Sequence, residues 1–227
     1  MEFPLLYEEN NTKGTLNMMV AARDNKVKRF IFASSSSVYG DTPTLPKIES
    51  KPVTPLSPYA ATKKTNELMC YNYHHLYQIP IACIRFFTVY GPRQRPEMAI
   101  HKFTRLMYED KEIPVFNNGN CLRDFTYIDD IIQGIVAIYK HPHLKYDIVN
   151  LGESQTISTL DLIKLIEKHT GQIAKLKLMP AQPGDVEQTY ADISHPKKVY
   201  NYSPHYPVDQ GINAFIKWYK KKENLVQ

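Results

Sequence analysis

The sequence predicts an α/β protein whose parallel sheet is covered by helices on both faces. Segments with apolar residues at helical spacing alternate along the chain with short, continuous apolar runs. Such runs are typical of strands buried on both faces, as in parallel sheets with right-handed crossovers. The remaining long segments are rich in Pro, Asn, Gly and Asp. In open α/β sheets such loops gather beyond the carboxyl ends of the strands, where ligands bind.

The first half of the chain shows this alternation clearly. Leu16, Met19 and Val20 recur at helical spacing and predict the first helix. The runs KRFIFAS and IACIRFF each predict a buried strand, and a long helix entered through Ser57 separates them. The predicted elements are a helix at 11–25, a strand at 28–34, a helix at 54–77 and a strand at 81–87.

In the second half, the same patterns predict further helices and a strand. These are a helix at 128–141, a strand at 146–151, a helix at 159–170 that Gly171 closes, and a final helix at 210–222. Asp129 and Asp130 precede the apolar run IIQGIVAIY, so we interpret them as capping residues of its helix. The segments 91–98, 114–123 and 179–207 are predicted loops that form a substrate-binding lobe.

The composition argues against several functional classes. The net charge is +5, but the basic residues are spread along the chain, so the sequence indicates no nucleic-acid partner. No apolar stretch approaches the roughly 18 residues of a membrane span, and the chain does not open with the basic and apolar regions of a signal peptide. The three cysteines form no CxxC pair and the eight histidines show no metal-ligand spacing. We therefore expect no metal site and a reducing, cytoplasmic setting.

A cluster of hydroxyl groups follows the strand predicted at 28–34. It includes Ser35, Ser36 and Ser37, at the end of a strand where a ligand site is expected, although a serine run also suits a turn. Tyr59 and Lys63 are four residues apart, so the phenol and the ammonium share one helix face. A nearby positive charge lowers the pKa of a phenol toward neutrality, which makes Tyr59 a candidate base. With 16 tyrosines, a chance Tyr-x-x-x-Lys match is the alternative.

At these positions the chain resembles the extended short-chain dehydrogenases that epimerise nucleotide sugars. The likeness runs from Tyr7 almost to the end, through FASSSSVYG, SPYAATKK, RFFTVYGPRQRPEMA, RDFTYIDDI, NLG and PGDVEQTYADI. Within this family it is most similar to the UDP-glucuronate 4-epimerases, because UDP-galactose epimerases usually carry asparagine in place of Thr88. Related dehydratases carry an Asp-Glu pair where this chain has Ser36 and Ser37, and related decarboxylases carry a glutamate at Ser37.

The resemblance implies a role for each of these residues. Tyr59 would be the general base on the sugar 4-hydroxyl, Lys63 would hold the nicotinamide ribose of NAD, and Ser35 would bind the reacting oxygen. Thr88 and Arg95 would hold a hexuronate carboxylate, for which a guanidinium is suited because it can bind both oxygens. The implied cofactor-binding residues are Asn11, Ser34, Tyr59, Lys63 and Phe86, and the implied substrate-binding residues are Ser36, Ser37, Thr88, Arg95, Val115, Phe116, Arg123 and Asp185.

The sequence lacks one feature that this family leads us to expect. A dinucleotide-binding fold opens with a strand, a Gly-x-x-Gly-x-x-Gly turn and a helix, but none of the nine glycines falls in that spacing. The resemblance therefore implies an N-terminally truncated chain, short by roughly 80 to 90 residues. We expect a partial Rossmann-like, doubly wound sheet that lacks its first strands, over 1–90 and 124–152. A smaller nucleotide-sugar-binding lobe would comprise 91–123 and 153–227.

Three hypotheses for the function follow from the resemblance. The first is NAD-dependent 4-epimerisation of a UDP-sugar, from UDP-glucuronate to UDP-galacturonate, by transient oxidation at C4. The second is an inactive truncated remnant that binds UDP-sugars without NAD chemistry. The third is a UDP-glucose 4-epimerase. The resemblance also implies a homodimer that is formed through a four-helix interface containing the helix at 54–77.

Overall fold

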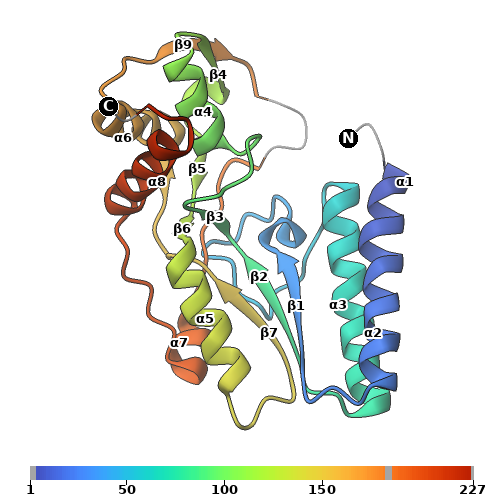
Figure 1. The fold of residues 1–227 in the computed structure, drawn as a ribbon. Coiled ribbons are helices and arrows are strands. Elements are labelled where there is room, and N and C mark those ends of the chain that lie inside the picture. Colours follow the sequence, from blue (N-terminus) through green and yellow to red (C-terminus); the bar gives the residue numbers. More distant parts are fainter. Residues whose placement is uncertain (1–3, 182–185, 226–227) are drawn as a thin grey trace.

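The computed structural model describes residues 4–181 and 186–225 and contains the predicted parallel sheet (Figure 1). Its strands are β1 (Phe30–Ser35), β2 (Ile81–Phe86) and β7 (Tyr146–Leu151), in the order β1-β2-β7. Both pairs are parallel, and Ser34, Arg85 and Asn150 lie side by side across the sheet. The carboxyl ends of all the strands therefore meet at one edge. The three strand predictions are confirmed to within two residues.

Helices cover both faces of this sheet, as the continuous apolar runs predict. On one face, Ile81 and Cys83 pack in a core with residues of α3 (Pro58–Tyr77). On the other face, Ala82 and Ile84 pack with residues of α5 (Ile128–Lys140) and α7 (Ser194–Tyr200). Successive residues of β2 thus enter opposite cores, which is the two-residue period of a strand. The doubly wound α/β prediction is confirmed.

Two helix starts differ from the predictions by four residues or more. The first helical segment begins at Pro4 and not at Asn11, and it runs as α1 (Pro4–Tyr7), a π-helical turn η1 (Glu8–Lys13) and α2 (Gly14–Asp24) beside α3 (Figure 1). Helix α3 begins at Pro58 and not at Thr54, because the Ser57 side chain accepts a hydrogen bond from the Ala60 amide. A serine N-cap followed by proline is a strong helix start.

The second lobe lies beyond the carboxyl edge of the sheet (Figure 1). Its core is formed by α4 (Ala99–Tyr108), α6 (Thr159–Thr170) and α8 (Val208–Lys222) with β4 (Glu112–Phe116). The largely exposed strand β9 (Lys175–Met179) pairs with β4 in parallel. Two short ladders complete the structure, β3 (Thr88–Tyr90) with β6 (Phe125–Tyr127) and β5 (Leu122–Arg123) with β8 (Ile157–Ser158). The remaining turns are η2 (Ser36–Tyr39) and η3 (Asn117–Gly119).

Two of the predicted loops were wrong in part. The segment 114–123 contains most of β4 and all of β5, and the segment 179–207 contains α7. These elements are short, and they are stabilised by partners far away in sequence, such as Val115 opposite Leu178. The segment 91–98 is irregular, as predicted.

Buried carboxylates join the sheet to the second lobe. The Asp124 side chain is fully buried and accepts hydrogen bonds from the Glu153, Ser154 and Ala191 amides at 2.8, 3.1 and 3.0 Å. Asp130 is also fully buried and accepts from the amides of residues 205 and 206, which precede α8. The interpretation of Asp130 as a capping residue is therefore corrected: it lies in the first turn of α5 and holds a distant segment.

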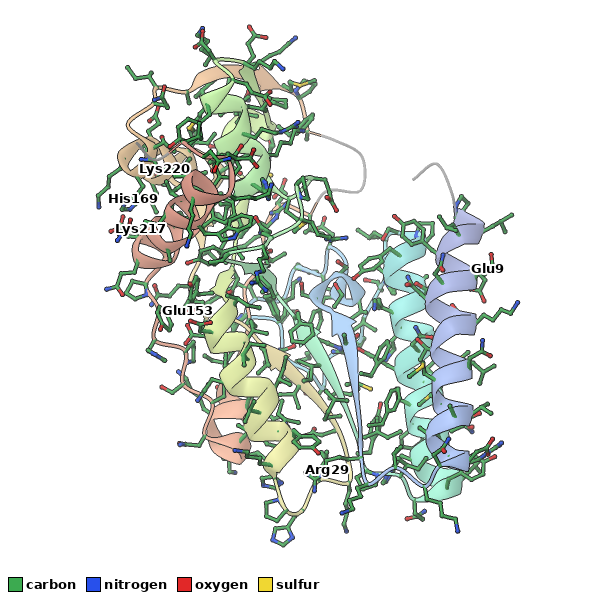
Figure 2. The ribbon with its side chains drawn as sticks, in the orientation of Figure 1. Glu9, Arg29, Glu153, His169, Lys217 and Lys220 are labelled. Atoms are coloured by element: carbon green, nitrogen blue, oxygen red, sulfur yellow. The ribbon has the colours of Figure 1, made fainter. Side chains whose placement is uncertain are left out.

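The pH dependence of stability should report on this junction. Glu153 lies near the start of α5 (Figure 2), where burial and the charges of Asp130 and Asp124 raise its pKa to about 7 from 4.5. Because the folded state favours the neutral acid, this contribution to stability is present below the unfolded-state pKa and is lost as the pH rises through the folded-state pKa. We expect urea denaturation to show a free energy of unfolding that falls between about pH 5 and pH 8. Glu153→Gln should flatten this slope, and equal slopes in the two proteins would contradict the assignment.

Candidate active site

The serine cluster turns sharply at the end of β1. Ser35 is the last residue of the strand, and its Oγ accepts a hydrogen bond from the Ser37 amide at 3.2 Å. The turn ends at Gly40, whose φ is +61° and whose missing Cβ would lie 1.9 Å from the Thr54 carbonyl oxygen. Only glycine fits there. The turn therefore keeps the serine hydroxyls at the carboxyl edge of the sheet.

Helix α3 brings Tyr59 and Lys63 to the same edge. The Lys63 Nζ donates to the Ala33 carbonyl of β1 at 2.8 Å. It lies 5.8 Å from the centroid of the Tyr59 ring, and burial lowers the pKa of Lys63. The ammonium is thus next to the phenol, as the four-residue spacing predicts.

Ser35, Tyr59, Lys63 and Thr88 line one cavity of about 530 Å³. These residues come from β1, α3 and β3, so the cavity forms where these elements meet. A hydroxyl, a phenol and an ammonium facing one space can bind a hydroxyl-bearing substrate and take its proton. Other residues on its wall are Ala33, Ser34, Ser36, Ser37, Phe86, Phe87, Val89, Arg93, Gln94, Arg95 and Met98.

A second cavity of about 240 Å³ lies beside the first. Thr88, Ser36 and Ser37 line both, which places them between the two spaces. Arg123 lines the second cavity, and its Nη1 donates to the Leu122 and Glu187 carbonyls at 3.0 and 3.1 Å. Among the described residues, this arginine forms no ion pair with a carboxylate, and its side chain lines the cavity.

The remaining predicted substrate-binding residues that the structure describes do not converge on one cavity as Ser35, Tyr59, Lys63 and Thr88 do. Arg95 is 75% exposed on the wall of the larger cavity and lies 3.4 Å from Glu97. Val115 is buried in the core of the second lobe, and neither it nor Phe116 lines the two cavities. Asp185 lies outside the described residues.

Two predicted cofactor residues have their side chains engaged within the protein. The Ser34 hydroxyl is buried and donates to Glu67 at 2.7 Å. Asn11 lies in η1, where its Nδ2 donates to Thr62 of α3 at 3.0 Å. Both hold α3 in place, from the sheet on one side and from the N-terminal helix on the other.

Sequence reasoning missed several polar residues near the site, among them Lys47, Glu67 and Arg85. Lys47 lines the smaller cavity from an irregular loop, with its Nζ bound to Thr42. Glu67 and Arg85 form a buried ion pair directly below the serine cluster. The spacing Tyr59, Lys63, Glu67 places all three on one helix face, and this was the available indication that Glu67 faces the sheet.

A serine at the end of one parallel strand, with a Tyr-x-x-x-Lys pair on the following helix, is typical of short-chain dehydrogenases. A model of the NAD dependent epimerase/dehydratase family matches residues 1–152. The UDP-glucuronate 4-epimerase of Thermodesulfobacterium geofontis is 42% identical to this chain over 229 residues, which cover all of this chain and 70% of that relative. This chain therefore belongs to the NAD-dependent epimerase/dehydratase family.

Solved structures agree with this assignment. The UDP-glucuronic acid 4-epimerase from Bacillus cereus, in complex with UDP-glucuronic acid and NAD, superposes with a TM-score of 0.90 and 39% identity, covering 95% of this chain and 68% of that one. A UDP-glucose 4-epimerase from Thermotoga maritima superposes with a TM-score of 0.91 and 25% identity over 97% of this chain and 72% of its own. These likenesses confirm the family and fold predicted from the motifs.

Membrane-spanning helices and clusters of metal ligands are both absent among the residues that the structure describes. No helix among them is long and apolar enough to cross a membrane. Within the same part of the chain, no group of three or more His, Cys, Asp and Glu side chains is placed to hold a metal ion.

Proposed function

We propose that this chain performs the C4 epimerisation of UDP-glucuronate to UDP-galacturonate with NAD. The observation that carries the proposal is the single cavity onto which Ser35, Tyr59, Lys63 and Thr88 converge. The 42% identity with a relative named as a UDP-glucuronate 4-epimerase supports the same substrate. Neither serine position after Ser35 carries the acid that a dehydratase or a decarboxylase would need.

In this mechanism the proton is handled by residues of the chain itself. Tyr59, as phenolate, takes the proton from the sugar 4-hydroxyl while the Ser35 hydroxyl binds the same oxygen. Lys63 favours the phenolate because its ammonium lies beside the ring. Bound NAD would supply the hydride acceptor and donor that reversible oxidation at C4 needs. Tyr59 then returns the proton, so the sugar undergoes no net redox change.

The residues present fit one end of NAD. Lys63 and Tyr59 offer an ammonium and a phenol to a ribose on the wall of the larger cavity, and Phe86 offers an apolar surface. The side chains of Ser34 and Asn11 are hydrogen-bonded to Glu67 and Thr62 of α3. These two residues would therefore support NAD binding indirectly, by holding α3 in place. For the pyrophosphate end, the sequence contains no Gly-x-x-Gly turn.

On the substrate side, the two cavities divide the roles. Thr88 and Arg95 would hold the hexuronate carboxylate, with Ser36 and Ser37 beside the sugar, in the larger cavity. Arg123 would pair with the diphosphate from the smaller cavity. The backbone at Val115 and Phe116 would face the uracil, and Asp185 would bind the uridine ribose.

Replacement of the proposed base tests the mechanism. Tyr59→Phe removes the proton acceptor but keeps the ring, so we expect kcat for conversion of UDP-glucuronate to fall by about 10²- to 10⁴-fold, with little change in the binding of UDP. Chromatography of the two UDP-hexuronates and titration calorimetry with UDP and with NAD provide the measurements. The control is Tyr71→Phe, which lies on the same helix outside the cavity. Undiminished turnover in Tyr59→Phe would contradict the proposal, and UDP binding without NAD binding or turnover would favour the remnant hypothesis.

The preference for an acidic sugar should depend on Arg95. Charge-assisted hydrogen bonds contribute about 1.5–3 kcal/mol, so Arg95→Gln should weaken UDP-glucuronate binding by about 10- to 100-fold and leave UDP-glucose binding nearly unchanged. Titration calorimetry with both sugars measures this ratio. Arg105→Gln, on α4 and outside both cavities, is the matched control. An equal effect on both sugars would instead favour the neutral-sugar hypothesis.

We also propose that the chain dimerises through α2 and α3. These helices lie side by side at one end of the molecule (Figure 1) and expose large apolar side chains. Two copies of this helix pair would form a four-helix interface that removes these side chains from water. The exposed side chains are Leu16 and Met18 on α2 and Leu68, Tyr71, Leu76 and Tyr77 on α3.

A charge within this surface should separate the subunits. Leu68 is 60% exposed, so Leu68→Glu should leave the fold intact but place a carboxylate in the interface, which is costly to desolvate. Sedimentation velocity should show a dimer for the wild type and a monomer for this variant. Ile173→Glu, at a residue that is 86% exposed in the second lobe, should remain dimeric. A monomeric wild type would contradict the dimer proposal.

A further inference from the structure

Helix α3 is attached to β1 at two consecutive residues of the strand. Lys63 donates to the carbonyl of Ala33 at 2.8 Å, and the next residue, Ser34, donates to Glu67 at 2.7 Å. Lys63 and Glu67 are one helical turn apart on α3, and Ser35 follows directly on β1. These two hydrogen bonds therefore fix the position of α3 along β1, and with it the position of Tyr59 relative to Ser35.

The Glu67 carboxylate is itself held on both oxygens. Arg85 of β2 donates from Nε to Oε1 and from Nη2 to Oε2, each at 2.8 Å, and both side chains are 1% exposed. Lys64 also donates to Oε2, at 3.1 Å. Burial alone would raise the pKa of Glu67, but the Arg85 hydrogen bonds and charge outweigh it and lower the pKa below its ordinary value. Glu67 is thus an anion that accepts from β1 and β2 together.

Arg85 is fixed in turn by the rest of the sheet. Its guanidinium lies 4.7 Å from the centroid of the Tyr39 ring, and its Nη1 donates to the Glu49 carbonyl at 3.3 Å. The Tyr39 hydroxyl donates to Asn150 of β7 at 2.8 Å. Because Ser34, Arg85 and Asn150 are paired across the three strands, the attachment of α3 involves the whole sheet.

We propose that Glu67, held by Arg85, is a positioning residue that sets Tyr59 and Lys63 opposite Ser35. The proposal rests on the roles proposed above for Tyr59, Lys63 and Ser35. The apolar contacts below α3 are not directional, whereas a two-point carboxylate–guanidinium contact is. If Lys63 leaves Ala33 to hold a ligand, the Ser34–Glu67 bond is the attachment that stays. A displacement of about 1 Å can reduce turnover by roughly 100-fold.

Two variants separate positioning from simple stabilisation. Glu67→Gln keeps the shape but loses the charge that binds Arg85. Breaking one partner of a buried pair can unfold a protein, so the second variant is the double replacement Glu67→Met with Arg85→Met, since apolar residues of similar volume often restore stability. Both variants are first compared with the wild type by thermal unfolding and circular dichroism.

The direct readout is the titration of the Lys63 ammonium, which needs neither NAD nor substrate. Carbon-13 NMR of reductively methylated lysines follows it, and the signal missing from Lys63→Arg assigns it. Burial is what lowers the pKa of Lys63, so a displaced helix should return the ammonium to water and raise its pKa. Loss of the Glu67 anion would lower this pKa and loss of the Arg85 cation would raise it, so the two electrostatic effects offset each other in the double variant, where the adjacent pair is removed as a whole. We therefore expect the Lys63 pKa to rise in the folded double variant. An unchanged or lower value in that protein would overturn the proposal.

A half-buried carboxylate elsewhere provides the control. Asp147 of β7 accepts from Tyr200 at 2.5 Å and contacts His195 at 2.8 Å, which ties α7 to the sheet far from Tyr59. Asp147→Asn should lower stability without altering the titration of Lys63. If it raises the Lys63 pKa as much as the double variant does, the effect is general loosening and the proposal fails.

The second readout is turnover of UDP-glucuronate with NAD. Mispositioning should lower kcat by roughly 100-fold while KM stays within about threefold in the folded double variant. If this stable variant turns over as fast as the wild type, the proposal is overturned. If the wild type does not turn over, the proposed function fails, while the Lys63 titration still decides whether Glu67 positions the helix.

Discussion

The parallel, in-register pairing of β1 with β2 is the constraint on which the other features of the site depend. It places Ser34 opposite Arg85 and ends both strands at one edge, so that Ser35 and Thr88 reach the same cavity. A shift of one residue would reverse the face of every side chain in β2. Arg85 would then turn away from Glu67, and α3 would lose its charged attachment to the sheet.

The buried Glu67–Arg85 pair contributes little net stability, because burying two charges has a large desolvation cost. Desolvation of two charges is offset only by good geometry, and loss of one partner costs about 3–5 kcal/mol out of a total stability of about 5–15 kcal/mol. Apolar residues would fill the same space at lower cost. What they cannot supply is direction, because the Glu67 carboxylate accepts hydrogen bonds from Ser34 of β1 and from Arg85 of β2 at the same time. This explains why a charged pair lies beneath a site whose chemistry depends on distance.

The sequence was sufficient to predict the sheet and the central part of the site. Continuous apolar runs mark β1, β2 and β7, and Ser35, Tyr59 and Lys63 could be placed together because parallel strands end at one edge. The short strands β5 and β9 were not predicted, because ladders of a few residues carry little periodicity and depend on distant partners. Likewise, Glu67 resembles an ordinary helix-surface glutamate, and only the tertiary structure shows that it meets Arg85.

The site combines two electrostatic environments. Beneath the site the charges of Glu67 and Arg85 are buried and paired, so the low-dielectric surroundings strengthen their interaction. On the substrate side Arg95 is largely exposed, and its pair with Glu97 is screened by water. A bound hexuronate would have to exclude that water before the guanidinium interacts strongly. The sheet can thus keep the proton-transfer groups fixed, while Arg95, which we propose distinguishes an acidic sugar from a neutral one, lies in the exposed loop 91–98.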